Sequence, residues 1–409
     1  MDILKTLFSS QALSALRHRN FRLFWTGQFI SFTGTWMQYV AQGWLVLKLT
    51  DSPFYLGLVG ASGSLPILFL TLIGGVMADR FQKRAIIILT QIFSMVISLI
   101  LAILISSGTI AVWHIILLAA LFGIVNAFDI PARQSFQIEM VGREDLLNAI
   151  ALNSAAFNAA RIIGPAAAGL FIGYLGLEVC FYINAFSFIP VLIGLSKMTF
   201  SGYKKDVPSG GFKEKIIEGL RFIKGEPKVF TIILLVAIIS LLGIPFLTLM
   251  PVFARDILKV GPTGLGLLMS SAGAGAFIGA IFLAFRIDIK KKGFLVASSG
   301  ILFSLTLIIF SLSRTLWLSM FVLFIGGWGM ISLMATVNSL LQLSVPDDLR
   351  GRVMSAFALV FLGFTPIGNL IIGWMAERLG TPLAVTLGGI LCLITIILLY
   401  WRRPEMLRL

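Results

Sequence analysis

Three ionisable residues lie inside long apolar stretches of this chain, where a charge is unfavourable. Asp129 precedes Arg133 by four residues and follows Asn126 by three, so the three side chains share one face of a helix. Arg161 lies in the middle of a later apolar stretch, on a face with Asn158, and no acidic residue lies within two helical turns of it. A charge at the centre of a lipid bilayer costs roughly 2.5 kcal/mol or more, so we expect these groups to be paired, hydrated or functional.

Two interpretations of Asp129 remain open. It either forms an ion pair with Arg133 that fixes the cytoplasmic end of its helix, or it carries protons. Arg161 cannot carry protons, because a guanidinium stays protonated inside proteins. We expect Arg161 to act as a fixed positive charge, which binds an anionic or carbonyl-bearing substrate or changes the protonation of a nearby carboxylate.

Polar residues form a stripe along the first long apolar segment, at spacings of three, four, three and four residues. They are Gln28, Ser31, Thr35, Gln38 and Gln42. Because polar side chains that face lipid lose hydrogen bonds, we expect the stripe to face protein or a water-filled cavity. The stripe as a whole favours a cavity, and a hydrogen bond to a neighbouring helix is the alternative for any one residue. Trp36 offers an aromatic surface beside it.

An acidic residue followed by a basic cluster ends the second apolar segment. The residues concerned are Gly75, Asp79, Arg80, Lys83 and Arg84. Glycine lets neighbouring helices approach closely, and charges at the membrane surface bind helix ends and lipid phosphates. This arrangement suits a latch that holds and releases.

Patterns of enzymes and metal sites are missing. The sequence has no GxxxxGK[ST] phosphate loop, no GxSxG nucleophile turn, no HExxH and no paired carboxylates within its apolar segments. Cys180 and Cys392 are isolated from each other and from His18 and His114. The sequence therefore predicts no catalytic residue, no cofactor and no metal.

The elements that must position these residues are membrane-spanning helices. Of the 409 residues, 58% are hydrophobic and only 12% are charged, which is too few charges to cover a soluble domain. The net charge of +14 does not indicate a nucleic-acid partner, because the basic residues lie in short loops between apolar segments. The lipid bilayer is the expected surrounding.

We expect twelve spans in two sets of six. They cover residues 22–47, 55–77, 84–106, 112–134, 146–173, 178–199, 228–253, 263–285, 293–312, 315–341, 352–376 and 381–401. This predicts an N-terminal half at 1–199, a cytoplasmic linker at 200–227 and a C-terminal half at 228–409. Residues 212–224 of the linker have one apolar face and several basic residues, which predicts a helix lying on the lipid surface.

Both termini are expected in the cytoplasm, because most of the 32 lysines and arginines then fall on the cytoplasmic side. The protein is thus predicted to be a multi-pass protein of the cell (inner) membrane. The halves also resemble each other: residues 137–149 and 342–356 have similar amphipathic loops, and each precedes a helix with a proline inside, Pro165 and Pro366. Two repeated halves with a substrate path at their interface are typical of secondary transporters.

The loop from Gly75 to Arg84 resembles the cytoplasmic signature of the major facilitator superfamily, with Gln82 where that signature has glycine. Residues 16–31, 34–46, 126–136 and 164–169 are similar to the enterobactin-exporter-like and macrolide-exporter-like drug:proton antiporters of that superfamily. The resemblance implies a twelve-helix all-α membrane fold and an antiporter-like helix bend at Gly164, Pro165 and Gly169. The fourth-helix arginine-glutamine-glycine signature of the family is missing from this chain.

The resemblance implies a secondary active transporter that exports a small amphiphilic molecule, such as a drug, siderophore or secondary metabolite. Its mechanism would be alternating access, driven by antiport of protons, in a monomeric protein. Two alternatives remain: a lipid or lysolipid facilitator without proton coupling, and a membrane receptor or scaffold that transports nothing. The expected substrate-cavity and coupling residues are Gln28, Ser31, Thr35, Trp36, Gln38, Gln42, Asn126, Asp129, Asn158 and Arg161. The expected latch residues are Gly75, Asp79, Arg80, Lys83, Arg84 and Arg133.

Overall fold

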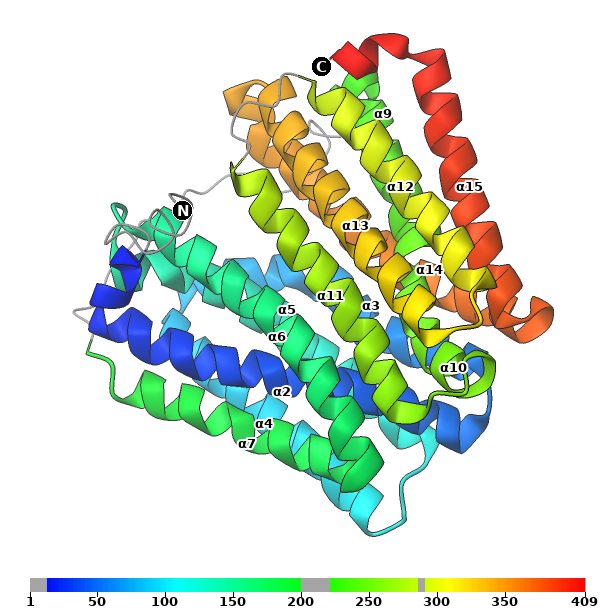
Figure 1. The fold of residues 1–409 in the computed structure, drawn as a ribbon. Helices are drawn as coiled ribbons and strands as arrows, with labels where there is room; N and C mark the ends of the chain where they lie inside the picture. The colour runs from blue at the N-terminus through cyan, green and yellow to red at the C-terminus, as the bar shows by residue number, and fades with distance from the viewer. Residues whose placement is uncertain (1–12, 200–220, 286–290, 409) are drawn as a thin grey trace, which may run out of the picture. The chain divides into compact units, whose positions relative to one another are not determined.

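A computed structural model describes residues 13–199, 221–285 and 291–408, and every regular element in these ranges is helical (Figure 1). Most of the expected surface helix at 212–224 lies outside the described residues. So do the start of the N-terminal segment and most of the loop before residue 292.

The first half of the chain consists of a short 3₁₀ turn followed by six long helices. These are η1 (Ser14–Arg17), α2 (Arg19–Thr50), α3 (Pro53–Arg80), α4 (Lys83–Ser106), α5 (Val112–Val141), α6 (Leu146–Tyr174) and α7 (Leu177–Ser196). Their predicted bounds agree to within a few residues, except that α3 and α5 continue further, to Arg80 and Val141.

The second half starts with an irregular helix. It runs through α9 (Pro227–Ile238), η2 (Ile239–Gly243), η3 (Ile244–Leu249), α10 (Met250–Val252) and η4 (Phe253–Ile257). In η2 and η4 the helix is locally π-wound, and in η3 it is 3₁₀. The regular helices that follow are α11 (Gly261–Phe285), α12 (Lys292–Leu312), α13 (Leu316–Ser344), α14 (Asp347–Leu379) and α15 (Thr381–Arg402), and the short η5 (Pro404–Arg408) ends the described chain.

Eleven helices of the described chain are long and apolar enough to cross a membrane, counting residues 227–257 as one. The twelfth expected span, α2, has 32 residues but is not among them. It carries the polar stripe with its three glutamines, which lowers its mean hydropathy. The prediction of an all-α membrane protein is confirmed.

The helices form two compact units that do not follow the midpoint of the chain. Unit 1 combines residues 13–42 with 66–199, and unit 2 combines residues 43–65 with 221–408. The outer ends of α2 and α3 and the turn between them therefore pack with the helices of the second half. The expected N-terminal half at 1–199 and C-terminal half at 228–409 describe the order of the helices along the chain, and they stay a prediction.

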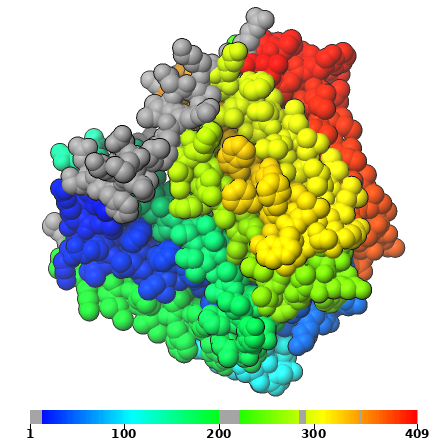
Figure 2. All heavy atoms as spheres, in the orientation of Figure 1, coloured from blue at the N-terminus to red at the C-terminus, as the bar shows by residue number. Residues whose placement is uncertain are grey.

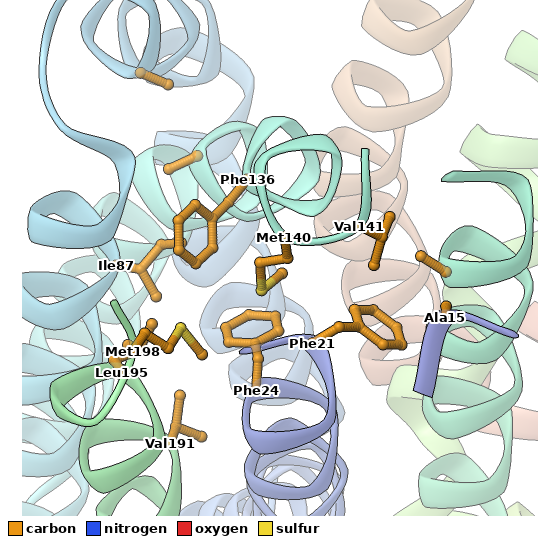
Figure 3. Packing of buried hydrophobic residues seen from close by; sticks show 13 residues of the cluster. Ala15, Phe21, Phe24, Ile87, Phe136, Met140, Val141, Val191, Leu195 and Met198 are labelled. Carbon is orange, nitrogen blue, oxygen red and sulfur yellow. The ribbon is translucent and has the colours of Figure 1, made fainter. Parts of the chain in front are cut away.

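An apolar core closes one end of unit 1. Phe24 of α2 lies against Met140 of α5, and its ring meets the Phe136 ring edge to face with centroids 6.0 Å apart, whereas Phe21 points toward Val141 (Figure 3). Ile87 of α4 joins them, and all of these side chains are at least nine-tenths buried. The core ties the start of α2 to the ends of α4, α5 and α7, so that α5 and α6 are held in register beside α2.

In unit 2, side chains of α2 and α3 are tied to the second half by charged groups. The Arg255 guanidinium in η4 contacts the Asp51 carboxylate and donates to the Leu47 carbonyl at 3.1 Å. The Glu377 carboxylate of α14 accepts a hydrogen bond of 2.7 Å from the Ser52 hydroxyl and a longer one from the Phe54 N–H. These bonds satisfy groups at the end of α2 and at the start of α3. We call residues 43–65 the outer corner.

Candidate functional site

Asp129 lies in a closed hydrogen-bonded group within the helices of unit 1. Its side chain is buried, with 3% exposed. One carboxylate oxygen accepts hydrogen bonds from the Thr90 hydroxyl at 2.9 Å and the Gln91 amide at 3.1 Å, and the other faces the Arg133 guanidinium at 2.9 Å. The spacing of four residues along α5 does produce the Asp129–Arg133 pair. Both carboxylate oxygens are thereby occupied, as expected for a charge in a membrane interior.

Arg133 connects this group to α2. Its guanidinium carbon lies 4.9 Å from the centre of the Phe32 ring. Phe32 in turn meets Phe157 of α6 edge to face, with centroids 5.4 Å apart. Arg133 was also expected in the latch; its ion pair is with Asp129, and its latch role stays a prediction.

Arg161 of α6 has different surroundings. Its guanidinium carbon lies 5.7 Å from the centre of the Trp36 ring on α2, which is a cation–π contact. Trp36 also contacts Tyr39 and Phe157, with ring centroids 5.8 Å apart in each case. In the described part of the chain, no carboxylate oxygen lies within 4 Å of Arg161.

The glycine of the expected antiporter motif explains how Arg161 reaches Trp36. A Cβ added at Gly164 would lie 2.6 Å from the Trp36 Cβ and 2.8 Å from the Thr33 carbonyl oxygen. Only glycine allows this approach of α6 to α2. Pro165 and Gly169 are buried in the same helix. Arg161 is one turn before Gly164, so the close contact brings its side chain over the ring.

The polar stripe of α2 divides between different surroundings. Gln28, Ser31 and Gln38 are buried, whereas Thr35 and Gln42 are half-buried. The Gln38 carbonyl oxygen accepts a hydrogen bond of 2.7 Å from the Asn184 amide of α7, which also donates to the Ser98 hydroxyl of α4 at 3.1 Å. Figure 1 shows α2, α4 and α7 running side by side. Gln38 thus has a partner inside the protein, and the cavity role of the stripe stays a prediction.

The two expected asparagines bond to their own helices. The Asn126 amide donates to the Phe122 carbonyl and the Asn158 amide to the Ser154 carbonyl, each at 2.9 Å. Both are half-buried. Asn158 shares its turn of α6 with Phe157 and lies three residues before Arg161.

Several partners in this region were not predicted. Thr90, Gln91, Ser94 and Ser98 are buried on one side of α4, and Asn184 is buried on α7. The spacing of Gln91, Ser94 and Ser98 by three and four residues is the same signal that identified the stripe of α2. The polar residues in the otherwise apolar α4 segment could therefore have predicted this buried polar stripe.

The expected latch residues lie at the end of α3 and the start of α4. Lys83 forms an ion pair with Glu139 of α5, and Arg84 donates to the Ser196 carbonyl at the end of α7 at 3.1 Å. Asp79 and Arg80 are exposed, and a Cβ added at Gly75 would meet nothing within 4 Å. Lys83 and Arg84 thus bind inside unit 1, and the latch role of Asp79 stays a prediction.

The N-terminal turn η1 is attached to the start of α6. The Asp145 carboxylate accepts a hydrogen bond from the Ser14 hydroxyl and pairs with His18 Nε2 at 2.7 Å. The Ala15 N–H donates to Asn148 at 3.0 Å. The bond from Ser14, followed by that from His18, holds the pKa of Asp145 below its ordinary value of 3.8.

Unit 2 has a groove of about 370 Å³ between α12 and α15. The side chains of these helices, yellow and red, lie next to each other in Figure 2. Most of the side chains that line the groove are apolar, Phe294 and Leu407 among them. None of the predicted site residues lines it. The groove therefore does not coincide with the charged groups of unit 1.

Known protein families and structures agree with this architecture. A family model described as a transmembrane secretion effector matches residues 10–407. The staphyloferrin A transporter of Staphylococcus aureus is 25% identical over 400 residues, covering 95% of this chain and 98% of that protein. The multidrug efflux pump Tap of Mycolicibacterium fortuitum is 26% identical, and the match covers 85% of this chain and 87% of that protein. Macrolide efflux protein A of Streptococcus pyogenes is 21% identical, and the match covers 91% of this chain and 93% of that protein.

Solved structures of transporters share the fold. A bacterial homolog of the human lysosomal transporter Spinster, in an inward-facing and occupied conformation, superposes with a TM-score of 0.75 at 13% identity, covering 95% of this chain and 97% of that one. The nucleoside transporter NupG gives a TM-score of 0.73 at 10% identity, with 95% and 99% covered. At these identities the likeness shows the fold alone.

Proposed function

This chain belongs to the transmembrane secretion effector family of the major facilitator superfamily, and from that membership we propose that it exports a small amphiphilic molecule from the cytoplasm by proton antiport. It is a multi-pass membrane transporter and not an enzyme. Its relatives include a staphyloferrin A transporter, a multidrug efflux pump and a macrolide efflux protein, and the two efflux proteins support the outward direction.

The observation that carries the proposal is the set of ionisable groups inside the helices of unit 1. Asp129, Arg133 and Arg161 lie within α5 and α6, two of the helices that are long and apolar enough to cross a membrane. A protein that only anchors or scaffolds has no use for charges there, because each is costly to insert. A transporter that moves a polar group or a proton requires them.

Asp129 is the candidate for the proton. Its carboxylate is buried among α4 and α5 side chains, where it bonds to Thr90, Gln91 and Arg133. Protonation of Asp129 would release Arg133 from its ion pair. That release changes how α5 is held, which is the kind of coupling that alternating access requires.

The direction of transport depends on orientation in the membrane. The charge distribution of the loops supports cytoplasmic termini, and a monomer is sufficient because each chain contains both halves. With this orientation the Asp129 group and the Lys83–Glu139 pair lie toward the cytoplasm.

The test is efflux of a fluorescent amphiphile from proteoliposomes, with and without an imposed pH gradient. We expect the gradient to accelerate efflux in the wild type. Arg161→Ala is expected to abolish efflux and Arg161→Lys to restore part of it, because lysine keeps the charge but loses the planar fork. Asp129→Asn is expected to reduce the effect of the gradient at least tenfold while substrate binding changes little.

Each variant is first checked for membrane insertion and a single peak in size-exclusion chromatography. Arg314→Gln, in the connection between α12 and α13 of unit 2, is the matched control, since Arg314 bonds only to the nearby Ser311 and Ser313 carbonyls in the described structure. Gradient-independent efflux by the wild type would contradict proton antiport and favour a facilitator.

A further inference from the structure

Arg161 differs from the other charged residue of unit 1 that lies against an aromatic ring. Arg133 has a carboxylate at 2.9 Å as well as its ring contact, whereas the contact of Arg161 is with Trp36. Within the described residues no carboxylate lies near enough to neutralise Arg161. Asp129 is already occupied by Thr90, Gln91 and Arg133. The described residues therefore leave a permanent charge in a membrane helix for a ligand to balance.

The surroundings of Arg161 form a surface and not a closed core. Tyr39 and Phe157 remain 44% and 41% exposed, and Trp36 is half-buried. The Trp36 ring meets the rings of Tyr39 and Phe157 edge to face. A planar cation bordered by exposed aromatic rings offers two interactions at once. The guanidinium binds a carboxylate in a bidentate manner, and the rings pack against an apolar or aromatic body.

We infer that Arg161, Trp36, Tyr39 and Phe157 bind the carboxylate and the adjoining apolar body of the exported molecule, so that the substrates of this transporter are anionic amphiphiles. The inference rests on the proposed function, because it names the class of molecule that the same site exports. Its physical basis is charge balance. The ligand supplies the counter-charge that the described residues do not place beside Arg161, and Gly164 keeps α6 close enough to α2 for one ligand to touch both helices.

The position of the Arg161 guanidinium over the Trp36 ring adds a geometric reason. A guanidinium that lies against a ring presents its N–H groups along its edge, in the plane of the fork. The edge is where a carboxylate binds with two parallel hydrogen bonds. Trp36 thus positions Arg161 for an anion, and the half-buried Asn158 on the same turn adds an amide group beside it.

The experiment measures binding of three matched probes to the purified full-length chain in nanodiscs of phosphatidylcholine. The probes are naphthalene-2-carboxylate, its neutral primary amide and the cationic 2-naphthylmethylammonium. In the wild type we expect the carboxylate to bind at least about tenfold more tightly than the amide, and the cation to bind most weakly. Arg161→Gln is expected to bring the carboxylate and the amide to within about twofold of each other. Arg161→Lys should retain an intermediate preference.

Two controls separate the site from general charge effects. Arg314→Gln removes an arginine from unit 2 and should leave the wild-type preference unchanged. Trp36→Leu should weaken all three probes, because it removes ring contact, and should also lower the preference for the carboxylate. A wild type without preference for the carboxylate would overturn the inference, as would a preference that survives in Arg161→Gln.

A lipid phosphate is the other possible anion for Arg161. Nanodiscs that contain phosphatidylglycerol distinguish the two sources. Should phosphatidylglycerol abolish the carboxylate preference of the wild type, a lipid headgroup occupies the site and the inference is wrong. A preference that persists in the presence of phosphatidylglycerol supports the exported molecule as the ligand.

Efflux of the same probes from proteoliposomes distinguishes this inference from the proposed function. Export of all three probes at similar rates would leave the transporter role standing and would exclude selection for anions. Binding with the expected preference but without efflux would support the site and contradict the export function.

Discussion

At the scale of single residues, neighbouring groups decide what each charge of unit 1 can do. Arg133 and Asp129 bind each other, so their charges cancel inside the protein. Arg161 lies on Trp36, and its charge stays available to a ligand. The sequence spacing predicts the first pair because both residues are on one helix. The sequence spacing does not predict Trp36 as the neighbour of Arg161, because the residues of α6 do not show which other helix lies beside Arg161.

The close contact at Gly164 leads to a prediction about stability. Gly164→Ala places a methyl group against the Trp36 side chain and the Thr33 carbonyl, so we expect a loss of about 1–3 kcal/mol and a clear fall in the Tm. The matched control is Gly75→Ala, whose new methyl group meets nothing within 4 Å. Thermal unfolding of both variants in detergent, followed by tryptophan fluorescence, checks this. Equal Tm values for the two variants would contradict the packing described at Gly164.

Asp145 leads to a prediction about pH. Because its folded pKa lies below the ordinary value of 3.8, its bonds to Ser14 and His18 are fully present above about pH 4 and are lost as the pH falls through the lower, folded pKa. We expect a spin label at Leu13 to be restrained at neutral pH and to become mobile below about pH 4. Asp145→Asn should make the label mobile across the whole range. A label that is equally mobile in both proteins at pH 7 would show that Asp145 does not hold η1.

At the scale of elements, the sequence predicts the regular helices well and misses the irregular one. Eleven of the spans are recognisable as apolar runs of sufficient length. The twelfth, α2, is recognisable by its stripe of polar residues. The π-wound and 3₁₀ turns between residues 239 and 257 were not predicted. Pro245 has no N–H for the Leu241 carbonyl, and a Cβ at Gly368 of α14 would clash with that carbonyl. The distortion thus depends on a close neighbour that is more than 100 residues away, which local spacing does not reveal.

The partners of the site residues were missed for the same reason. Asn184 lies 146 residues from Gln38, and Gln91 lies 38 residues from Asp129. Each is a polar residue in an apolar span, and that much the sequence shows. The pairs that form depend on which helices pack next to each other. Twelve similar helices allow many such arrangements, and the sequence does not choose among them.

The outer corner leads to a prediction at this scale. Glu377→Ala removes the acceptor for the Ser52 hydroxyl and the Phe54 N–H at the start of α3, so we expect a loss of about 0.5–1 kcal/mol, as for other helix caps. Glu377→Gln retains an acceptor oxygen and should lose less. The Tm of the two variants in matched detergent provides the comparison. A Tm for Glu377→Ala that equals or exceeds that of Glu377→Gln would show that the cap contributes nothing.

At the scale of the whole molecule, the proposed cycle requires the cytoplasmic ends of the two halves to separate and return. We predict that Asp79 acts as part of a latch, as the superfamily signature implies, and that Asp79→Asn raises the inward-facing population. Spin labels at the exposed residues Phe81 and Leu343 report this as a longer mean distance. Glu178→Gln, a charge change at the start of α7, is the control. An unchanged distance distribution in Asp79→Asn would exclude the latch.

The grouping of the outer corner with unit 2 has a consequence for expressing the protein in two pieces. A chain cut in the linker gives an N-terminal fragment that carries residues 43–65 away from the helices that cover them. That fragment exposes Gly57, which in the intact protein lies against Gly373. In the other fragment, Arg255 loses Asp51 and Glu377 loses Ser52. Neither fragment is therefore expected to be stable when produced alone. Co-production should rescue both, and the rescue should weaken when Arg255→Gln and Glu377→Ala are combined in the C-terminal fragment.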